Sequence, residues 1–197
     1  MSVKTERMIE SIVQQLKWGV LNISGNPEAM VLLGKMHSLL EISPGINTLK
    51  VYGLPIRDYM LIQIQRLFNT YTMLRKIDLG MAELTDVSAP VVAQLITDCR
   101  LESLQLGGSG CYFTPNKFTH EGLAMILSAA EKSKTLKCIG LDCLVAIKQK
   151  QVNTMEEMPV MFANLISNLK TLSTLDLSHS ELNDENQETI ADGLKHA

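Results

Sequence analysis

One pattern of apolar positions recurs six times along the chain, in the order apolar–x–x–apolar–x–apolar. The first residues of the six copies are Trp18, Ile46, Leu74, Leu101, Leu136 and Leu172. Successive copies begin 28, 28, 27, 35 and 36 residues apart. The last two apolar positions of each copy alternate with polar or small residues, as they do in a strand that is buried on one face. Each copy therefore predicts a short β-strand.

The segments between the copies have a different spacing. Their apolar residues return at intervals of three and four, which is the pattern of the buried side of an amphipathic helix. These stripes fall within residues 29–40, 61–71, 91–99, 123–130, 162–169 and 190–194. Ser88 and Thr119 stand just ahead of two of them, where helix N-caps favour small polar side chains. A strand and a helix repeated at this period predict a solenoid.

Residues 4–17 form a separate element with its own apolar stripe, which includes Met8, Ile12 and Leu16. We expect a helix that caps the exposed end of the first repeat; the alternative is a helix that docks on a partner. No comparable cap follows the last stripe. Either the last helix covers that end of the array, or the array continues past residue 197. The domain prediction is a single repeat domain over residues 1–197.

A resemblance to a known family rests on the last copy. The segment Leu172–Leu182, which runs into the stripe at 190–194, resembles the ribonuclease-inhibitor type of leucine-rich repeat. The resemblance implies an α/β solenoid bent into a horseshoe, with a parallel sheet on the concave face and helices on the convex face. One departure stands out, because the family's buried asparagine after the strand appears only as Asn26. The equivalent positions hold Leu54, Ala82, Ser109, Leu144 and Ser180, so we expect less regular turns.

Composition narrows the possible functions. The chain has 197 residues, is 46% apolar and carries a net charge of −3, which gives no general attraction to nucleic acid or to an anionic membrane. No run of 18 apolar residues exists, and the polar N-terminus does not resemble a secretory signal. We expect a cytoplasmic protein, or one delivered into a host cytosol if it is a bacterial effector. The four cysteines are scattered and are expected to be reduced thiols.

Motifs for catalysis or metal binding are weak. The glycine-rich stretch 107–110 is not followed by the Lys-Ser/Thr pair of a phosphate loop. Cys111 and His120 are a lone thiol and imidazole, and such pairs are recognised by geometry rather than by spacing. Cys138 and Cys143 lack a second pair of zinc ligands. We therefore predict no enzyme activity, no catalytic residues, no cofactor and no metal site.

In a fold of this type, the residues between the core positions of each strand face the concave surface. The candidates for partner contact on this face are Lys50, Tyr52, Lys76, Asp78, Asp142 and Asp176. The lysines belong to the N-terminal half of the array, whereas Asp142 and Asp176 belong to the C-terminal half. This distribution suits a dipolar partner; the alternative is a solvated sheet face without a partner.

Copies four and five are longer than the first three, and the extra residues follow their strands, in 107–118 and 145–153. Because neighbouring repeats stack, the two insertions are predicted to emerge side by side on one rim. They carry an aromatic and basic set that is a second candidate contact patch: Tyr112, Phe113, Lys117, Phe118, Lys148 and Lys150. The alternative is that the aromatic side chains turn inward and close the longer loops.

The predicted function is that of a non-enzymatic protein–protein interaction module, either an intracellular adaptor, a fragment of a sensor or an effector. The partner is expected to be another protein, and neither nucleic acid nor a membrane. A regulator that activates GTPases is the alternative, because the Ran GTPase-activating proteins share this type of repeat.

Overall fold

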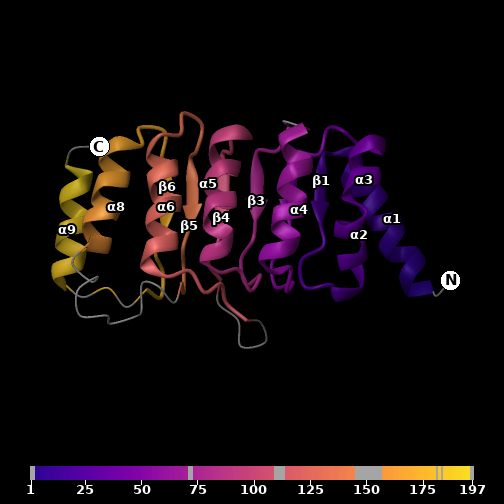
Figure 1. The fold of residues 1–197 in the computed structure, drawn as a ribbon, viewed down its shortest axis with the longest axis horizontal. Coiled ribbons are helices and arrows are strands. Elements are labelled where there is room, and N and C mark those ends of the chain that lie inside the picture. The colour runs from indigo at the N-terminus through magenta and orange to yellow at the C-terminus, as the bar shows by residue number, and fades with distance from the viewer. Residues whose placement is uncertain are drawn as a thin grey trace.

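A computed structural model describes residues 3–70, 73–108, 114–144, 157–180, 182 and 184–195. Its centre is a six-stranded parallel sheet in which each strand lies next to the one before it in the chain (Figure 1). The strands are β1 (Val20–Asn22), β2 (Thr48–Lys50), β3 (Lys76–Asp78), β4 (Ser103–Gln105), β5 (Cys138–Gly140) and β6 (Thr174–Asp176). The repeats therefore stack in a row, with one strand per repeat.

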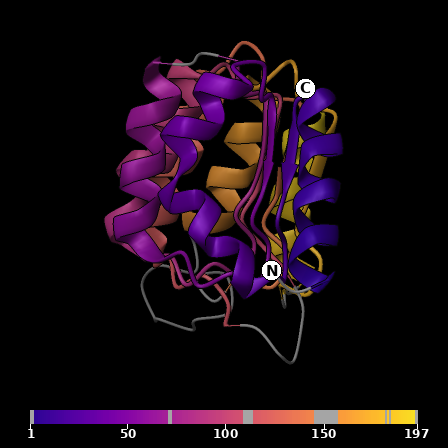
Figure 2. The same cartoon turned by 90° about the vertical axis from the view of Figure 1, so that its right-hand side faces the viewer.

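One helix precedes the first strand, and further helices follow the strands along the array. They are α1 (Val3–Lys17), α2 (Met30–Gly34), α3 (Met36–Ile42), α4 (Arg57–Thr70), α5 (Ala89–Asp98), α6 (His120–Glu131), α8 (Glu157–Asn168) and α9 (Asp184–Leu194). Two short 3₁₀ helices, η1 (Pro27–Ala29) and η2 (Asp86–Ser88), precede α2 and α5. Seen along the row of strands, α2, α3 and α4 lie on one side of the sheet and α1 on the other, while α1 and α9 belong to opposite ends of the array (Figures 1 and 2).

The six predicted strands and their register are confirmed. The middle residues of the strands form one row across the sheet: Leu21, Leu49, Ile77, Leu104, Ile139 and Leu175. The first five are at most 2% exposed, so their side chains enter the apolar core between sheet and helices. Burial of such side chains is the main favourable contribution to folding. The signature thus marks the core positions of the sheet.

The first repeat departs from its predicted helix. The apolar stripe over residues 29–40 predicts one continuous helix, but the structure has two, α2 and α3, separated at Lys35 (φ −107°, ψ 18°). Gly34 stands at the break, and glycine is a poor helix former because of its backbone freedom. Leu33 and Leu40 still reach the core, one from each helix.

Carboxylates join neighbouring repeats at the start of their helices. Asp58, at the beginning of α4, accepts hydrogen bonds from the Thr85 N–H (2.9 Å), the Thr85 hydroxyl (2.7 Å) and the Ser88 hydroxyl. Asp86 accepts in the same way from the N–H and hydroxyl of Thr119 in the next repeat. Ser88 and Thr119 precede α5 and α6 as predicted, but their side chains make no bond to the helix that follows.

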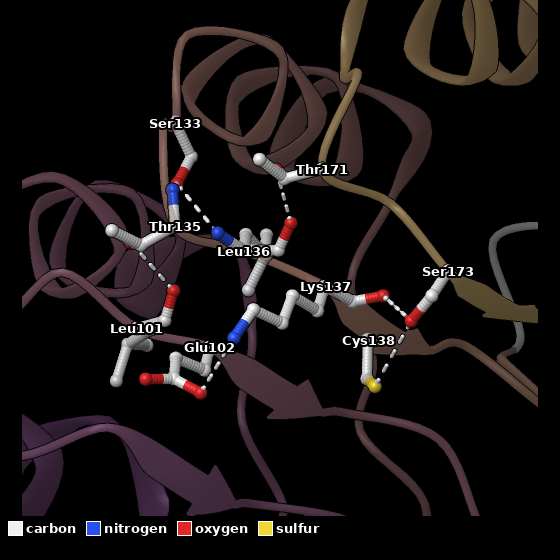
Figure 3. Close-up of polar contacts among 9 residues, drawn as sticks. All are labelled: Leu101, Glu102, Ser133, Thr135, Leu136, Lys137, Cys138, Thr171 and Ser173. Atoms are coloured by element: carbon white, nitrogen blue, oxygen red, sulfur yellow. Dashed lines mark hydrogen bonds and ion pairs between the residues drawn. The ribbon is translucent and has the colours of Figure 1, made fainter. Parts of the chain in front are cut away.

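Hydroxyl groups join the later repeats at the other end of the strands, just ahead of each signature (Figure 3). The Thr135 hydroxyl donates to the Leu101 carbonyl oxygen (2.9 Å), and the Thr171 hydroxyl donates to that of Leu136 (2.6 Å). Each threonine therefore bonds to the first signature residue of the preceding copy. The carboxylates thus join the second repeat to the third and the third to the fourth, and the threonine hydroxyls join the fourth to the fifth and the fifth to the sixth.

A buried amide closes the turns in the middle of the array. Asn116, which is 1% exposed, accepts from the N–H groups of Ala82 (3.1 Å) and Leu84 (3.0 Å). Its amide nitrogen donates to the carbonyl oxygens of Leu79 (2.8 Å) and Leu106 (2.7 Å). The sequence register places no asparagine here, because Asn116 comes from the insertion of the fourth copy. Asn116 thus supplies to this pair of repeats an amide that the repeat register itself lacks.

Candidate protein-binding surface

The carboxyl ends of the strands bring four of the predicted contact residues together, all of them partly buried. Asp78 and Asp176 occupy the same register position on β3 and β6, and Tyr52 and Asp142 lie two residues beyond that position in their own repeats. The carboxylates of Asp78 and Asp142 act electrostatically on Tyr52, and Asp176 acts on Asp142. We call these four residues the tyrosine–aspartate surface.

Glycines make room for the Tyr52 ring. A Cβ atom added to Gly80 would lie 2.7 Å from Cδ2 of Tyr52, and one added to Gly108 would lie 2.7 Å from its Cε2. Such contacts are too short, so only glycine leaves space for the ring at both positions. The Tyr52 ring, which belongs to the second repeat, therefore rests against the backbone of the third and fourth repeats. Partial burial, followed by the charges of Asp142 and Asp78, raises the pKa of Tyr52.

The aspartates are held by hydrogen bonds. Asp78 accepts from the Gly80 N–H (3.1 Å), and Asp142 accepts from the side-chain amide of Gln105 (2.8 Å). Desolvation is the main cause that raises the pKa values of Asp78 and Asp142, and repulsion from another aspartate adds to it in each case. The pKa of Asp176 is lowered instead, by hydrogen bonds from Ser178. The surface combines a positioned aromatic ring with clustered negative charge.

Gln105 is a member of this site that sequence reasoning did not single out. It lies between Asp78 and Gly140 in the register and links β4 to Asp142 of the next repeat. A Cβ atom at position 140 would overlap its side-chain amide. The sequence feature that could have pointed to Gln105 is the glycine at the strand-face positions 80, 107 and 140, because a missing side chain there leaves space for a neighbouring one.

The lysines of the predicted dipolar face lie where the register puts them. Lys50 and Lys76 are exposed on β2 and β3, in the N-terminal half of the array. Lys50 stands beside Asp78 across the β2–β3 pair, and its charge lowers the pKa of that carboxyl group, although desolvation outweighs it. The separation of charge is therefore partial, because Asp78 lies among the lysines.

Only part of the predicted insertion patch falls within the described residues. Lys117 is exposed, and its N–H bonds to the Leu84 carbonyl oxygen (2.7 Å). Phe118 is 1% exposed, so it cannot be an exposed contact residue, and the alternative of an inward-turned aromatic applies to it. The bonds of Asn116 and Lys117 to the third repeat pull this segment onto the core. Tyr112, Phe113, Lys148 and Lys150 lie outside the described residues.

Signs of other chemistry are few in the described residues. Cys99, Cys138 and Cys143 are free thiols, and burial raises the pKa of Cys99 to about 11, which disfavours its reactive thiolate form. No group of three His, Cys, Asp or Glu side chains that could hold a metal ion occurs there. No helix in the described ranges is both long and apolar enough to cross a membrane.

Comparisons with known proteins support the fold. No family model matches the sequence, and no curated protein matches it. Among solved structures, the tropomodulin C-terminal domain of Caenorhabditis elegans is similar, with a TM-score of 0.62, 15% identity and coverage of 83% of this chain and 92% of that one. Leiomodin-1 actin-binding site 2 has a TM-score of 0.60 and 17% identity, over 83% of this chain and 87% of that chain. The fold is thus a leucine-rich-repeat-like array of α/β units.

Proposed function

We propose that this protein is a non-enzymatic protein-binding module that contacts its partner through the tyrosine–aspartate surface. Its repeats are of the ribonuclease-inhibitor type and bend into a horseshoe, so this surface lies on the concave face. The observation that carries the proposal is the Tyr52 ring, which rests against glycine backbone at positions 80 and 108 and is flanked by carboxylates.

Physical reasons favour such a surface for binding. Tyrosine is enriched among residues that contribute most to interfaces, because it offers a large contact area and a polar end. A ring already held by the backbone of two other repeats loses little freedom when a partner arrives. The neighbouring aspartates would attract a basic patch on that partner and speed its approach. The contact surface therefore suits a protein that presents Lys or Arg around a shallow apolar site.

Actin is the first partner to test. One similar structure is named as an actin-binding site of leiomodin-1, and it covers 83% of this chain. We therefore propose a cytoplasmic protein that binds actin. We also propose a second contact patch, which consists of the exposed Lys117 and of Tyr112, Phe113, Lys148 and Lys150.

The proposal is tested by titrating purified actin with the wild-type protein and with the double variant Asp142→Asn/Asp176→Asn. We expect the variant to bind at least about fivefold more weakly, and the difference to shrink at high salt, which screens exposed charges. Glu121→Gln on α6 is the matched control, because this glutamate is exposed outside the surface. Equal affinities for wild type and the double variant would reject the surface, and no binding by the wild type would reject actin.

A further inference from the structure

The outer edge of β6 presents the same backbone groups that each inner strand uses to form hydrogen bonds with the next strand. In each pair, the residue after one strand donates its N–H to the last residue of the next strand, as Leu106 does to Gly140 (2.9 Å) and Leu141 to Asp176 (2.9 Å). The carbonyl group before each strand accepts two bonds from the following copy. That of Lys137 accepts from the N–H groups of Ser173 (2.8 Å) and Thr174 (3.0 Å).

The corresponding groups of the last repeat are the N–H of Leu177 and the carbonyl oxygen of Ser173. Neither takes part in a backbone hydrogen bond within the described part of the chain, and no strand there pairs with the outer side of β6. Because β6 is already paired with β5, its backbone is held in the extended conformation that spaces the Ser173 carbonyl oxygen and the Leu177 N–H for another strand. The edge is therefore a template for one more parallel strand.

An apolar groove of about 450 Å³ lies along this edge. Its lining includes Leu172, Leu175 and Leu177 of the sixth signature, and Ile166, Ile190 and Leu194 of α8 and α9. The three signature leucines are only partly buried, whereas the equivalent Leu136, Ile139 and Leu141 of the fifth copy are at most 2% exposed. In the inner repeats, the apolar residues of the next copy cover these positions.

The opposite end of the sheet is covered differently. There α1 packs beside β1, and the side-chain oxygen of Gln15 accepts a hydrogen bond from the Asn22 N–H (2.7 Å). Ile12 of α1 is 6% exposed and joins the core, so the N-terminal edge of the sheet is both bonded and buried. The β6 edge has neither feature in the described residues.

We propose that the β6 edge and its groove bind an extended segment of a partner protein, which adds as a parallel strand with the pattern apolar–x–x–apolar–x–apolar.

Charge narrows the chemistry of that segment. The register places its third strand residue beside Asp176, as Lys50 lies beside Asp78 on the inner pair β2–β3. Opposite charges in adjacent strands stabilise a pair and like charges destabilise it. The segment therefore carries Lys or Arg at this position. This edge shares Asp176 with the tyrosine–aspartate surface, but its backbone groups and the groove residues lie outside that surface, and the inference does not rest on the proposed function.

The chain itself supplies a suitable probe. A labelled synthetic peptide with the sequence of residues 44–54 carries the second signature, with lysine at the required position. We expect it to bind the intact protein with a dissociation constant below about 1 mM in fluorescence anisotropy. Methylation of the peptide nitrogen that corresponds to Thr48, which would donate to the Ser173 carbonyl oxygen, should weaken binding at least about tenfold. No binding, or equal binding of the methylated peptide, would overturn the proposal.

Protein variants locate the site. Leu194→Glu should reduce peptide affinity at least about tenfold, and because this side chain is 63% exposed, the fold should tolerate the change. Val160→Glu on α8 is the matched control, since Val160 is also an exposed apolar residue (47%) but does not line the groove. Equal effects of the two variants would contradict the site.

Charge exchange and the oligomeric state complete the test. Asp176→Lys should weaken binding of the lysine peptide and strengthen binding of a peptide with glutamate at that position. If neither affinity changes, the register is wrong. Sedimentation of the protein alone should show a monomer. A concentration-dependent dimer that Leu194→Glu disrupts would overturn the proposal in favour of a second copy as the occupant.

Discussion

At the residue scale, Asn116 shows how one side chain can support two repeats. Its amide makes four hydrogen bonds to backbone groups that are otherwise buried between the third and fourth repeats. A buried backbone group without a hydrogen-bond partner costs free energy, so this one side chain removes the cost of four such groups. At the position where the family resemblance led us to expect asparagine, the chain instead buries Leu54, Ala82 and Leu144.

Asn116→Ala should therefore lower the free energy of unfolding by about 2–4 kcal/mol, because it leaves buried N–H and carbonyl groups without partners. Urea denaturation measures the loss. Asn26→Ala is the control, since Asn26 is half-buried and its side chain accepts from the Glu28 N–H and donates to the Met8 sulfur of α1, without bonding to the turn of another repeat in the described residues. A loss no larger than that of the control would show that the amide does not support the turns.

The thiol of Cys99 should resist alkylation in the folded protein at pH 8. Burial raises its pKa to about 11, so only a small fraction is thiolate at this pH, and the side chain is 1% exposed. Cys138 and Cys143 are partly exposed and should react first. Mass spectrometry after brief treatment with iodoacetamide gives the order; modification of Cys99 at the rate of Cys138 would contradict its burial.

Asp78→Asn should raise the melting temperature at pH 7, and the gain should vanish below about pH 3. The pKa of Asp78 is raised in the folded state, so the folded protein binds this proton more tightly than the unfolded chain does. The carboxyl group therefore contributes stability at low pH that is lost as the pH rises through its folded pKa. Asparagine can still accept the bond from Gly80. Thermal unfolding across this pH range is the measurement, and a constant difference would contradict the shift.

At the element scale, the strands were predictable and the contacts between repeats were not. Each strand is marked by its own signature, since alternation and burial are local properties of the sequence. Asp58 and Asp86 accept hydrogen bonds from residues 27 to 33 positions further along the chain, and the local sequence pattern does not predict these bonds. The predicted caps Ser88 and Thr119 illustrate the difference. They occupy the expected places, but their hydroxyl groups donate to carboxylates of the preceding repeat instead of capping the helix that follows.

Asp58→Ala should cost about 1–3 kcal/mol of unfolding free energy, because the Thr85 N–H and two hydroxyl groups lose a charged acceptor. Asp98→Ala is the matched control, since Asp98 is exposed at the end of α5 and, within the described residues, accepts only from the neighbouring Thr97 hydroxyl. Chemical denaturation followed by circular dichroism compares the two. Similar small losses in both variants would show that the carboxylate does not join the repeats.

At the scale of the whole molecule, six nearly identical strand positions create a regular surface, and glycines interrupt that regularity at the proposed contact site. Glycines at 80, 107 and 108 admit the Tyr52 ring and the Asp142 backbone, which larger residues would exclude. The sequence predicted Tyr52, Asp78, Asp142 and Asp176 as facing one side. It did not predict that they gather, because that follows from side-chain packing between repeats and not from the pattern within one repeat.

We propose that this face of the sheet, and not the helical side, binds a protein. A photo-crosslinking amino acid placed at Tyr52 tests it directly, with the same residue at Tyr59 as control, since Tyr59 is 57% exposed on α4. Both variants are expressed in the cells that naturally make the protein and are then illuminated. We expect a discrete crosslinked protein from position 52 and none from position 59. Crosslinks from position 59 alone, or the same products from both positions, would contradict it.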